Sequence, residues 1–132
     1  MHTFSKRYVI PFTRADVYAH WVSSETVIAL AQRMEVDAVP GGVYRLVMPG
    51  GFSMEGEFAE VVPEQRLVYF WQWQGSDERT QIEVEFDSED QNTTIDLTHS
   101  GFTSQESHNN HAQGWDNYIE GFTQHLQDIM EA

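Results

Sequence analysis

The fold is decided by residues 94–115, TIDLTHSGFTSQESHNNHAQGW, together with the amphipathic run that follows them. The first residues of this stretch predict a strand in which Ile95, Leu97 and His99 point to the same face. Two apolar side chains mark that face as the interior, so the imidazole ring of His99 points into the core. Burying such a ring without a partner costs about 1–3 kcal/mol. The fold must therefore supply a hydrogen bond, a water-lined cavity or a ligand.

The rest of the stretch predicts a long helix, from about residue 105 to residue 130. Its apolar residues recur at helical spacing and form one stripe: Trp115, Tyr118, Ile119, Phe122, Leu126 and Ile129. A helix of this length can cross a sheet and cover one of its faces.

The preceding residues predict one strand, two short helices and then six more strands. Tyr8, Ile10 and Phe12 alternate in the first strand, and Thr13 can cap the first helix. The helices are expected at residues 15–22 and 25–31. The later strands are expected at residues 34–39, 43–48, 52–62, 67–73, 81–86 and 93–100, with Gly56 marking a bulge or a close backbone approach. This order predicts an α+β fold in which a curved antiparallel sheet packs on the C-terminal helix.

Composition limits the possible functions. The length of 132 residues fits one domain, expected to span residues 1–132. A formal charge of −14 argues against binding to nucleic acids or anionic membranes. The absence of cysteine excludes disulfides and thiolate chemistry. We expect a cytoplasmic protein without membrane insertion, because the sequence has neither a secretory signal nor an apolar run of about 18 residues.

Several short motifs, in a fixed order, resemble one known superfamily. They are an early helix ending in Trp21, the turn at residues 40–42, Gly56, RLVYFW at residues 66–71, LTHSGF at residues 97–102, and His111 followed by Gly114 and Trp115. This set resembles the START/Bet v I-like (SRPBCC) superfamily, in the branch named after heat-shock-protein-90 ATPase activators. The resemblance implies a helix-grip fold, in which a strongly curved sheet wraps round the long helix and leaves a cavity. Members of the superfamily bind or transform small apolar molecules there.

A ligand cavity would be lined by aromatic side chains and a few polar ones. The residues expected to line it are Trp21, Met54, Phe58, Tyr69, Trp71, Trp73, His99, Trp115, Tyr118 and Phe122. The alternative is that the same side chains form an ordinary packed core.

Two histidines are the candidates for catalysis. His99 and His111 could meet where the strand leads into the final helix, with Tyr69, Tyr118 and Glu57 completing a polar set. The alternative is a hydrogen-bonded core histidine and a surface histidine. His108 and His111 lie one helical turn apart and, with His99, could also bind zinc, but Asn109 and Asn110 fit a flexible loop as well. We therefore expect neither a metal nor a cofactor.

The leading hypothesis is a small soluble protein that binds a hydrophobic or amphipathic molecule between the sheet and the C-terminal helix, as a monomer or homodimer. One alternative is a cyclase/dehydratase-type enzyme with His99 as acid and base, and the residues leave open whether the chain is an enzyme. Another is a co-chaperone-like interaction protein with an acidic face. That face would comprise Glu55, Glu57, Glu60, Glu83, Glu85, Asp87, Glu89 and Asp90. The co-chaperones that name the branch carry a further domain not seen here, so the resemblance does not imply their activator role.

Overall fold

A computed structural model describes residues 2–23, 33–51 and 53–130. The elements are β1 (His2–Ile10), α1 (Arg14–Trp21), β2 (Arg33–Val36), β3 (Val43–Val47), the short 3-10 helix η1 (Pro49–Gly51), β4 (Ser53–Val62), β5 (Arg66–Trp73), β6 (Arg79–Glu89), β7 (Asn92–Phe102) and α2 (Gln105–Met130). The helix expected at residues 25–31 lies outside the described residues. The remaining elements follow the predicted order.

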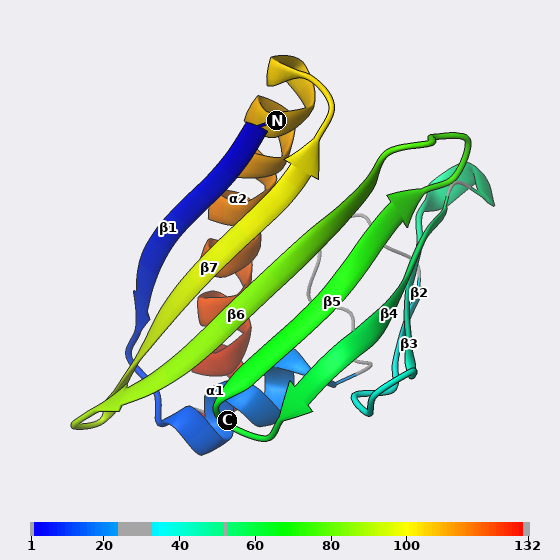
Figure 1. Cartoon of the computed structure of the whole chain (residues 1–132). Helices are drawn as coiled ribbons and strands as arrows, with labels where there is room; N and C mark the ends of the chain where they lie inside the picture. Colours follow the sequence, from blue (N-terminus) through cyan, green and yellow to red (C-terminus); the bar gives the residue numbers. More distant parts are fainter. Residues whose placement is uncertain (1, 24–32, 52, 131–132) are drawn as a thin grey trace.

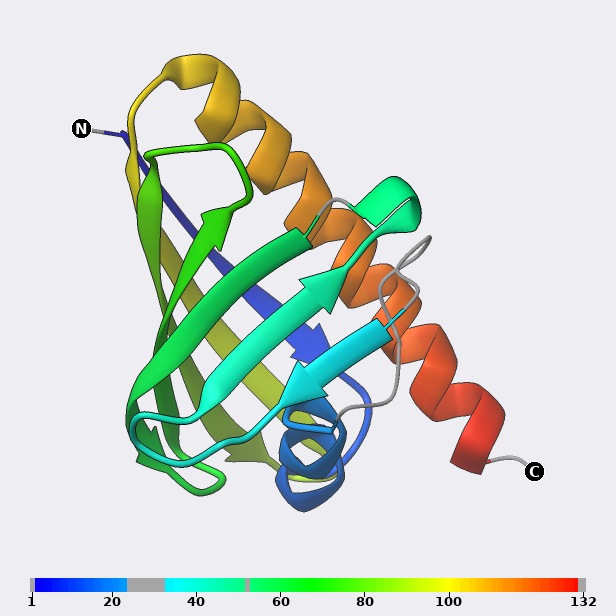
Figure 2. The same ribbon diagram turned by 90° about the vertical axis from the view of Figure 1, so that its right-hand side faces the viewer.

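The strands form one antiparallel sheet of seven strands, in the order β1-β7-β6-β5-β4-β3-β2. The strands β2 to β7 pair in sequence order, each with the next, and β1 pairs with β7 at one edge of the sheet. Helix α2 crosses one face of this sheet, as Figure 1 shows. In Figure 2 the strands β2 and β3 curl round toward the same helix. The predicted α+β helix-grip fold is confirmed.

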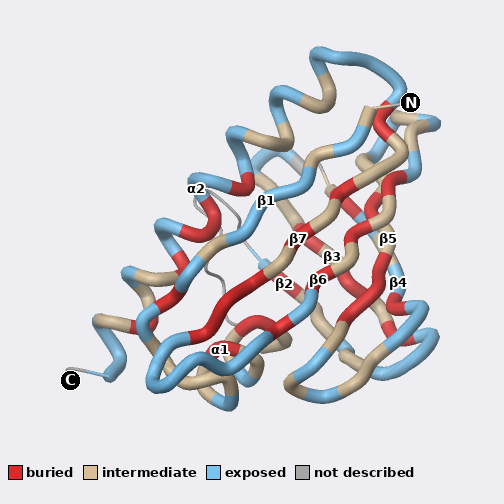
Figure 3. Tube along the Cα trace, turned by 60° about the vertical axis from the view of Figure 1, so that its left-hand side comes forward, coloured by how far each residue is buried: buried red, intermediate tan, exposed pale blue. Residues whose placement is uncertain are grey.

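The core lies between the concave face of the sheet and α2. In β6, Ile82, Val84 and Phe86 are buried and alternate with polar residues that face outward. Buried positions gather on the strands and on the side of α2 that faces them (Figure 3). The predicted helix stripe is correct from Trp115 to Leu126. Ile129 is an exception at 39% exposed, because the last turns of α2 extend past the sheet (Figure 2).

Strand β1 differs from the prediction because it begins at His2 and ends before Phe12. It pairs with β7 along its whole length, from His2 opposite Phe102 to Ile10 opposite Thr93. It is an edge strand, so most of its side chains are at least partly exposed, and the apolar alternation appears only at its end. The following helix begins as predicted, with the Thr13 side chain accepting a hydrogen bond from the Asp16 backbone N–H.

Gly56 marks a close approach of two backbones. Strands β4 and β5 keep one register from Met54 opposite Trp73 to Phe58 opposite Tyr69, and the irregularity follows Phe58. A Cβ atom at Gly56 would overlap the carbonyl oxygen of Phe70. The bulge alternative is therefore wrong at Gly56, and the close-approach alternative is correct.

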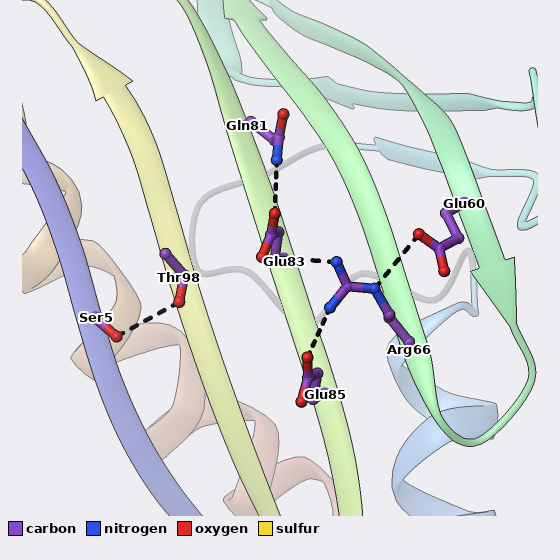
Figure 4. Close-up of polar contacts among 7 residues, drawn as sticks. All are labelled: Ser5, Glu60, Arg66, Gln81, Glu83, Glu85 and Thr98. Atoms are coloured by element: carbon purple, nitrogen blue, oxygen red, sulfur yellow. Dashed lines mark hydrogen bonds and ion pairs between the residues drawn. The ribbon is translucent and has the colours of Figure 1, made fainter.

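The outer face of the sheet carries ion pairs between acidic residues and arginines. Arg66 contacts three carboxylates, those of Glu60, Glu83 and Glu85 (Figure 4). Glu55 pairs with Arg45, and Glu57 pairs with Arg79. Three arginines thus pair with five of the eight residues of the acidic face, and the face keeps a net negative charge. Across the described segments, no helix is long and apolar enough to span a membrane.

Candidate functional site

A pocket of about 370 Å³ lies between the concave side of the sheet and the first half of α2. Its described lining residues are Tyr44, Leu46, Met48, Trp71, Trp73, Asn110, His111, Gly114, Trp115 and Tyr118. They come from β3, the residue after β3, β5 and α2. Helix α2 makes its main backbone contacts with β1 and β7. On the β3 side, the curved sheet and α2 lie farther apart, and the pocket is the space between them.

The structure divides the expected lining residues into two groups. Trp71, Trp73, Trp115 and Tyr118 line the pocket. The others are buried in the surrounding core: Trp21, Met54, Phe58, Tyr69, His99 and Phe122. Sequence reasoning missed the contribution of β3, although Tyr44, Leu46 and Met48 alternate in the way expected of one strand face. That alternation was the available signal.

Three indole rings form a stack that runs from α1 through α2 to β5. The planes of Trp21 and Trp115 are 8° apart with ring centroids at 6.2 Å. Those of Trp115 and Trp71 are 9° apart with centroids at 5.2 Å. Offset parallel stacking is a favourable arrangement for aromatic rings. One wall of the pocket, formed by Trp71 and Trp115, is therefore held by ring stacking that continues into the core.

His99 is fully buried and hydrogen-bonded at both ring nitrogens. The Trp115 indole N–H donates to Nδ1 at 2.9 Å, and Nε2 lies 2.7 Å from the Thr80 hydroxyl. Because an indole N–H can only donate, Nδ1 must be unprotonated, so Nε2 carries the hydrogen and donates to Thr80. Burial lowers the pKa of His99 to about 3, with a further contribution from His111. The ring is held neutral.

His111 lies beside His99 in the opposite tautomer. Its Nδ1 is 2.8 Å from the Ser107 carbonyl oxygen, which can only accept, so Nδ1 carries the hydrogen. Its Nε2 accepts from the Trp73 indole N–H at 3.2 Å. The two histidine ring centroids are 5.1 Å apart. The two catalytic candidates therefore meet, but protein groups already occupy all four of their nitrogens.

The other candidate polar residues do not converge on the histidine pair. Glu57 lies on the outer face and pairs with Arg79, while the Tyr69 hydroxyl accepts from the Trp21 indole N–H. The His108 Nδ1 contacts Gln105 and Asn109 in the first turns of α2. Within the described ranges, no group of three or more acidic or histidine side chains could hold a metal ion.

Comparisons with known proteins agree with this architecture. A sequence model of the family described as "Activator of Hsp90 ATPase homolog 1-like protein" matches residues 11–127. No curated protein matches the chain in sequence. A solved structure of a protein from Mesorhizobium loti has a TM-score of 0.86 at 16% identity, covering 96% of this chain and 98% of that one.

Two further solved structures have the same fold. An HSP90 activator from Plasmodium falciparum has a TM-score of 0.80 at 21% identity, covering 96% of this chain and 97% of that one. The protein Ara h 8.0201 has a TM-score of 0.78 at 14% identity, covering 96% and 98%. At these identities the likeness shows the fold alone.

Proposed function

Because the chain belongs to the family of Activator of Hsp90 ATPase homolog 1-like proteins, with the helix-grip fold, we propose that it binds a small hydrophobic or amphipathic molecule. The binding site is the pocket between β3, β5 and α2. The supporting observation is the pocket itself, about 370 Å³ and walled mostly by aromatic and aliphatic side chains. Ligand sites in proteins are typically apolar clefts of about 300–1,000 Å³ with a few placed polar groups.

A blocking variant tests this proposal. Gly114 lines the pocket, and a Cβ atom built on it would meet no heavy atom within 4 Å. Gly114→Leu is therefore expected to place a side chain in the pocket without disturbing the core. The matched control is Gln113→Leu, since Gln113 is an exposed neighbour on the same helix that does not line the pocket.

The measurement is a thermal-shift and native mass spectrometry screen with lipids, polyketides and aromatic metabolites. We expect at least one apolar class to stabilise the wild type and Gln113→Leu, since a ligand that binds only the folded state raises the apparent stability. Gly114→Leu should show no such shift. Equal shifts in all three proteins would place binding elsewhere, and no shift in the wild type would refute the proposal.

The arrangement of the histidines does not favour the alternative of a cyclase/dehydratase-type enzyme. General acid–base catalysis needs a nitrogen within hydrogen-bond reach of a substrate proton. At His99 the Trp115 N–H occupies Nδ1, and the Nε2 hydrogen is donated to Thr80. A substrate would have to displace one of these buried bonds before His99 could act.

One observation supports a second candidate, activation of an Hsp90-type ATPase. The similarity to the Plasmodium falciparum HSP90 activator covers nearly all of both chains. The test is the rate of ATP hydrolysis by purified Hsp90 with and without this protein. Stimulation that survives Gly114→Leu would indicate a role independent of the pocket. No stimulation at saturating protein would rule this candidate out.

A further inference from the structure

One side chain in the wall of the pocket can change its charge near neutral pH. Among the described residues that line the pocket, His111 is the only histidine, and none is Lys, Arg, Asp or Glu. The lining tyrosines, Tyr44 and Tyr118, keep their protons, because burial raises the pKa of both hydroxyls. Histidine is the side chain that ordinarily gains or loses its charge between about pH 5 and 8. The charge of this wall therefore depends on His111.

The proton state of His111 also decides whether two walls of the pocket are joined. The Trp73 indole N–H donates to Nε2 of His111 at 3.2 Å, and this bond links β5 to α2. Nδ1 already carries a hydrogen, which it donates to the Ser107 carbonyl oxygen. A further proton must therefore go to Nε2. An indole N–H can only donate, so two donors would then face each other and the bond would open.

Two titratable groups face His111 from other elements. His99 on β7 has its ring centroid 5.1 Å away and stays neutral at this pH, since burial lowers its pKa to about 3. Glu78, between β5 and β6, accepts from the Ser107 hydroxyl at 2.7 Å. Burial alone would raise the pKa of Glu78, but hydrogen bonds from Thr103 and Ser107, with a contribution from His111, lower it. An ionised carboxylate beside a neutral imidazole lets His111 take up a proton.

The two forms of His111 suit ligands of different charge. With a neutral ring, a carboxylate in the pocket would be buried without a counter-charge, which is strongly unfavourable. With a protonated ring, Nε2–H is released from Trp73 and can donate to a carboxylate. Hydrogen bonds of this charge-assisted kind are about twice as strong as those between neutral groups.

We propose that His111 sets the charge of the ligand that the pocket accepts: a neutral molecule when its ring is neutral, and a carboxylate when Nε2 is protonated and released from Trp73. This inference rests on the proposed function, since it concerns the ligand of the same pocket. The proton comes from the solvent and the carboxylate binds as the anion, so binding to the neutral protein takes up one proton. By linkage, the bound carboxylate holds that proton on His111.

Two probes with the same ring system separate the forms: 2-naphthamide, which is neutral, and 2-naphthoate, which is an anion. Isothermal titration calorimetry gives their affinities at about pH 8 and about pH 5.5, and the carboxylate is ionised at both because carboxyl groups ordinarily titrate near pH 4. From the higher to the lower pH, the affinity of naphthoate relative to naphthamide should rise about tenfold, the effect of a hydrogen bond to a charged group. Buffers of different ionisation enthalpy should show proton uptake with naphthoate and none with naphthamide.

Two histidine variants identify the group that titrates. His111→Gln cannot titrate, and its amide can still accept from Trp73, so its relative affinity for the two probes should be the same at both pH values. His108→Gln is the matched control, because His108 lies one turn earlier on α2 and does not line the pocket. It should keep the full change of the wild type.

The wild type without ligand provides a test that depends on no variant at the histidine. The sequence has 4 tryptophans, so the indole N–H signals in a 1H–15N spectrum are few, and Trp73→Phe identifies one of them. The Trp73 signal should move as the imidazole signals of His111 titrate, because its acceptor is lost. The signals of Trp21 and Trp115 should move less, since their acceptors are Tyr69 and His99.

The failures are distinguishable. If naphthoate does not bind at the lower pH, or if its relative affinity is the same at both pH values, the inference about His111 is overturned. Binding of naphthamide, or of any apolar class in the thermal-shift screen, would leave the proposed function standing. A pH effect that persists in His111→Gln assigns the switch to another group and also overturns the inference. A Trp73 signal that does not follow the His111 titration overturns the opening of the bond. If neither probe nor any screened compound binds, the proposed function itself fails.

Discussion

Acidification should destabilise this protein through His99. The ring is neutral in the fold because the Trp115 N–H points at Nδ1, so a proton added there would face another donor. In the unfolded chain the same ring takes up a proton near its ordinary pKa of 6.5, whereas in the fold the pKa is about 3. The unfolded state therefore binds more protons, and stability falls as the pH falls below 6.5.

The magnitude follows from the size of the shift. Each pH unit between the two pKa values is worth about 1.4 kcal/mol, so the whole shift corresponds to about 5 kcal/mol. Between about pH 7.5 and about pH 5, the expected loss from His99 alone is about 2 kcal/mol. Carboxylates add their own pH dependence, so the effect of His99 must be isolated by difference.

The assay is urea unfolding of the wild type, His99→Gln and His108→Gln across that pH range. His99→Gln cannot titrate at this position, so its deficit relative to the wild type should shrink by about 2 kcal/mol as the pH falls. His108→Gln is the control: it removes a histidine outside the core and should follow the wild-type curve. Parallel curves for the wild type and His99→Gln would refute the reasoning and mean that the buried ring does not resist protonation.

Three further predictions concern packing, charge and helix capping. Gly56→Ala should lower the free energy of unfolding by more than about 3 kcal/mol, because the new Cβ would overlap the Phe70 carbonyl oxygen. Gly114→Ala should raise the free energy of unfolding by about 0.5–1 kcal/mol, because the new Cβ meets no neighbour and alanine favours the helix more than glycine does. Urea unfolding measures both, and a fully stable Gly56→Ala would contradict the β4–β5 register. Arg66→Met should cost about 1 kcal/mol at low salt and less at high salt, and a salt-independent loss would contradict an electrostatic origin. Thr13→Ala should cost about 1 kcal/mol in thermal unfolding, and no loss would mean the cap is dispensable.

Periodicity predicted most of the fold. The apolar stripe on α2 and the alternation in β6 each show which side chains face the core. The length of α2 also predicted that it would pack across one face of the sheet. The first half of β1 lacked this signal, because an edge strand with few buried side chains needs no apolar alternation. Its position follows from pairing with β7, which is a contact between distant parts of the chain.

The candidate site was less predictable. Alternation correctly placed His99 in the interior, but its partner Thr80 lies on the neighbouring strand and Trp115 on the helix. Such partners depend on how the sheet and the helix come together. The alternation of apolar side chains also shows which face of a strand is buried. It does not show where the curved sheet and α2 separate to form a pocket. Phe58 and Tyr44 share that buried face, yet only Tyr44 lines the pocket.

The parallel indoles of Trp21, Trp115 and Trp71 also have an optical consequence. Rings within 9° of parallel at centroid distances of 5.2 and 6.2 Å can couple their electronic transitions and transfer excitation among themselves. The fourth tryptophan, Trp73, lies on the same strand as Trp71 and lines the same pocket. The tryptophan signals in the near-ultraviolet circular dichroism and emission of this protein therefore come from one region. A single spectrum can follow both the occupancy of the pocket and the docking of α2 on the sheet, without any added label.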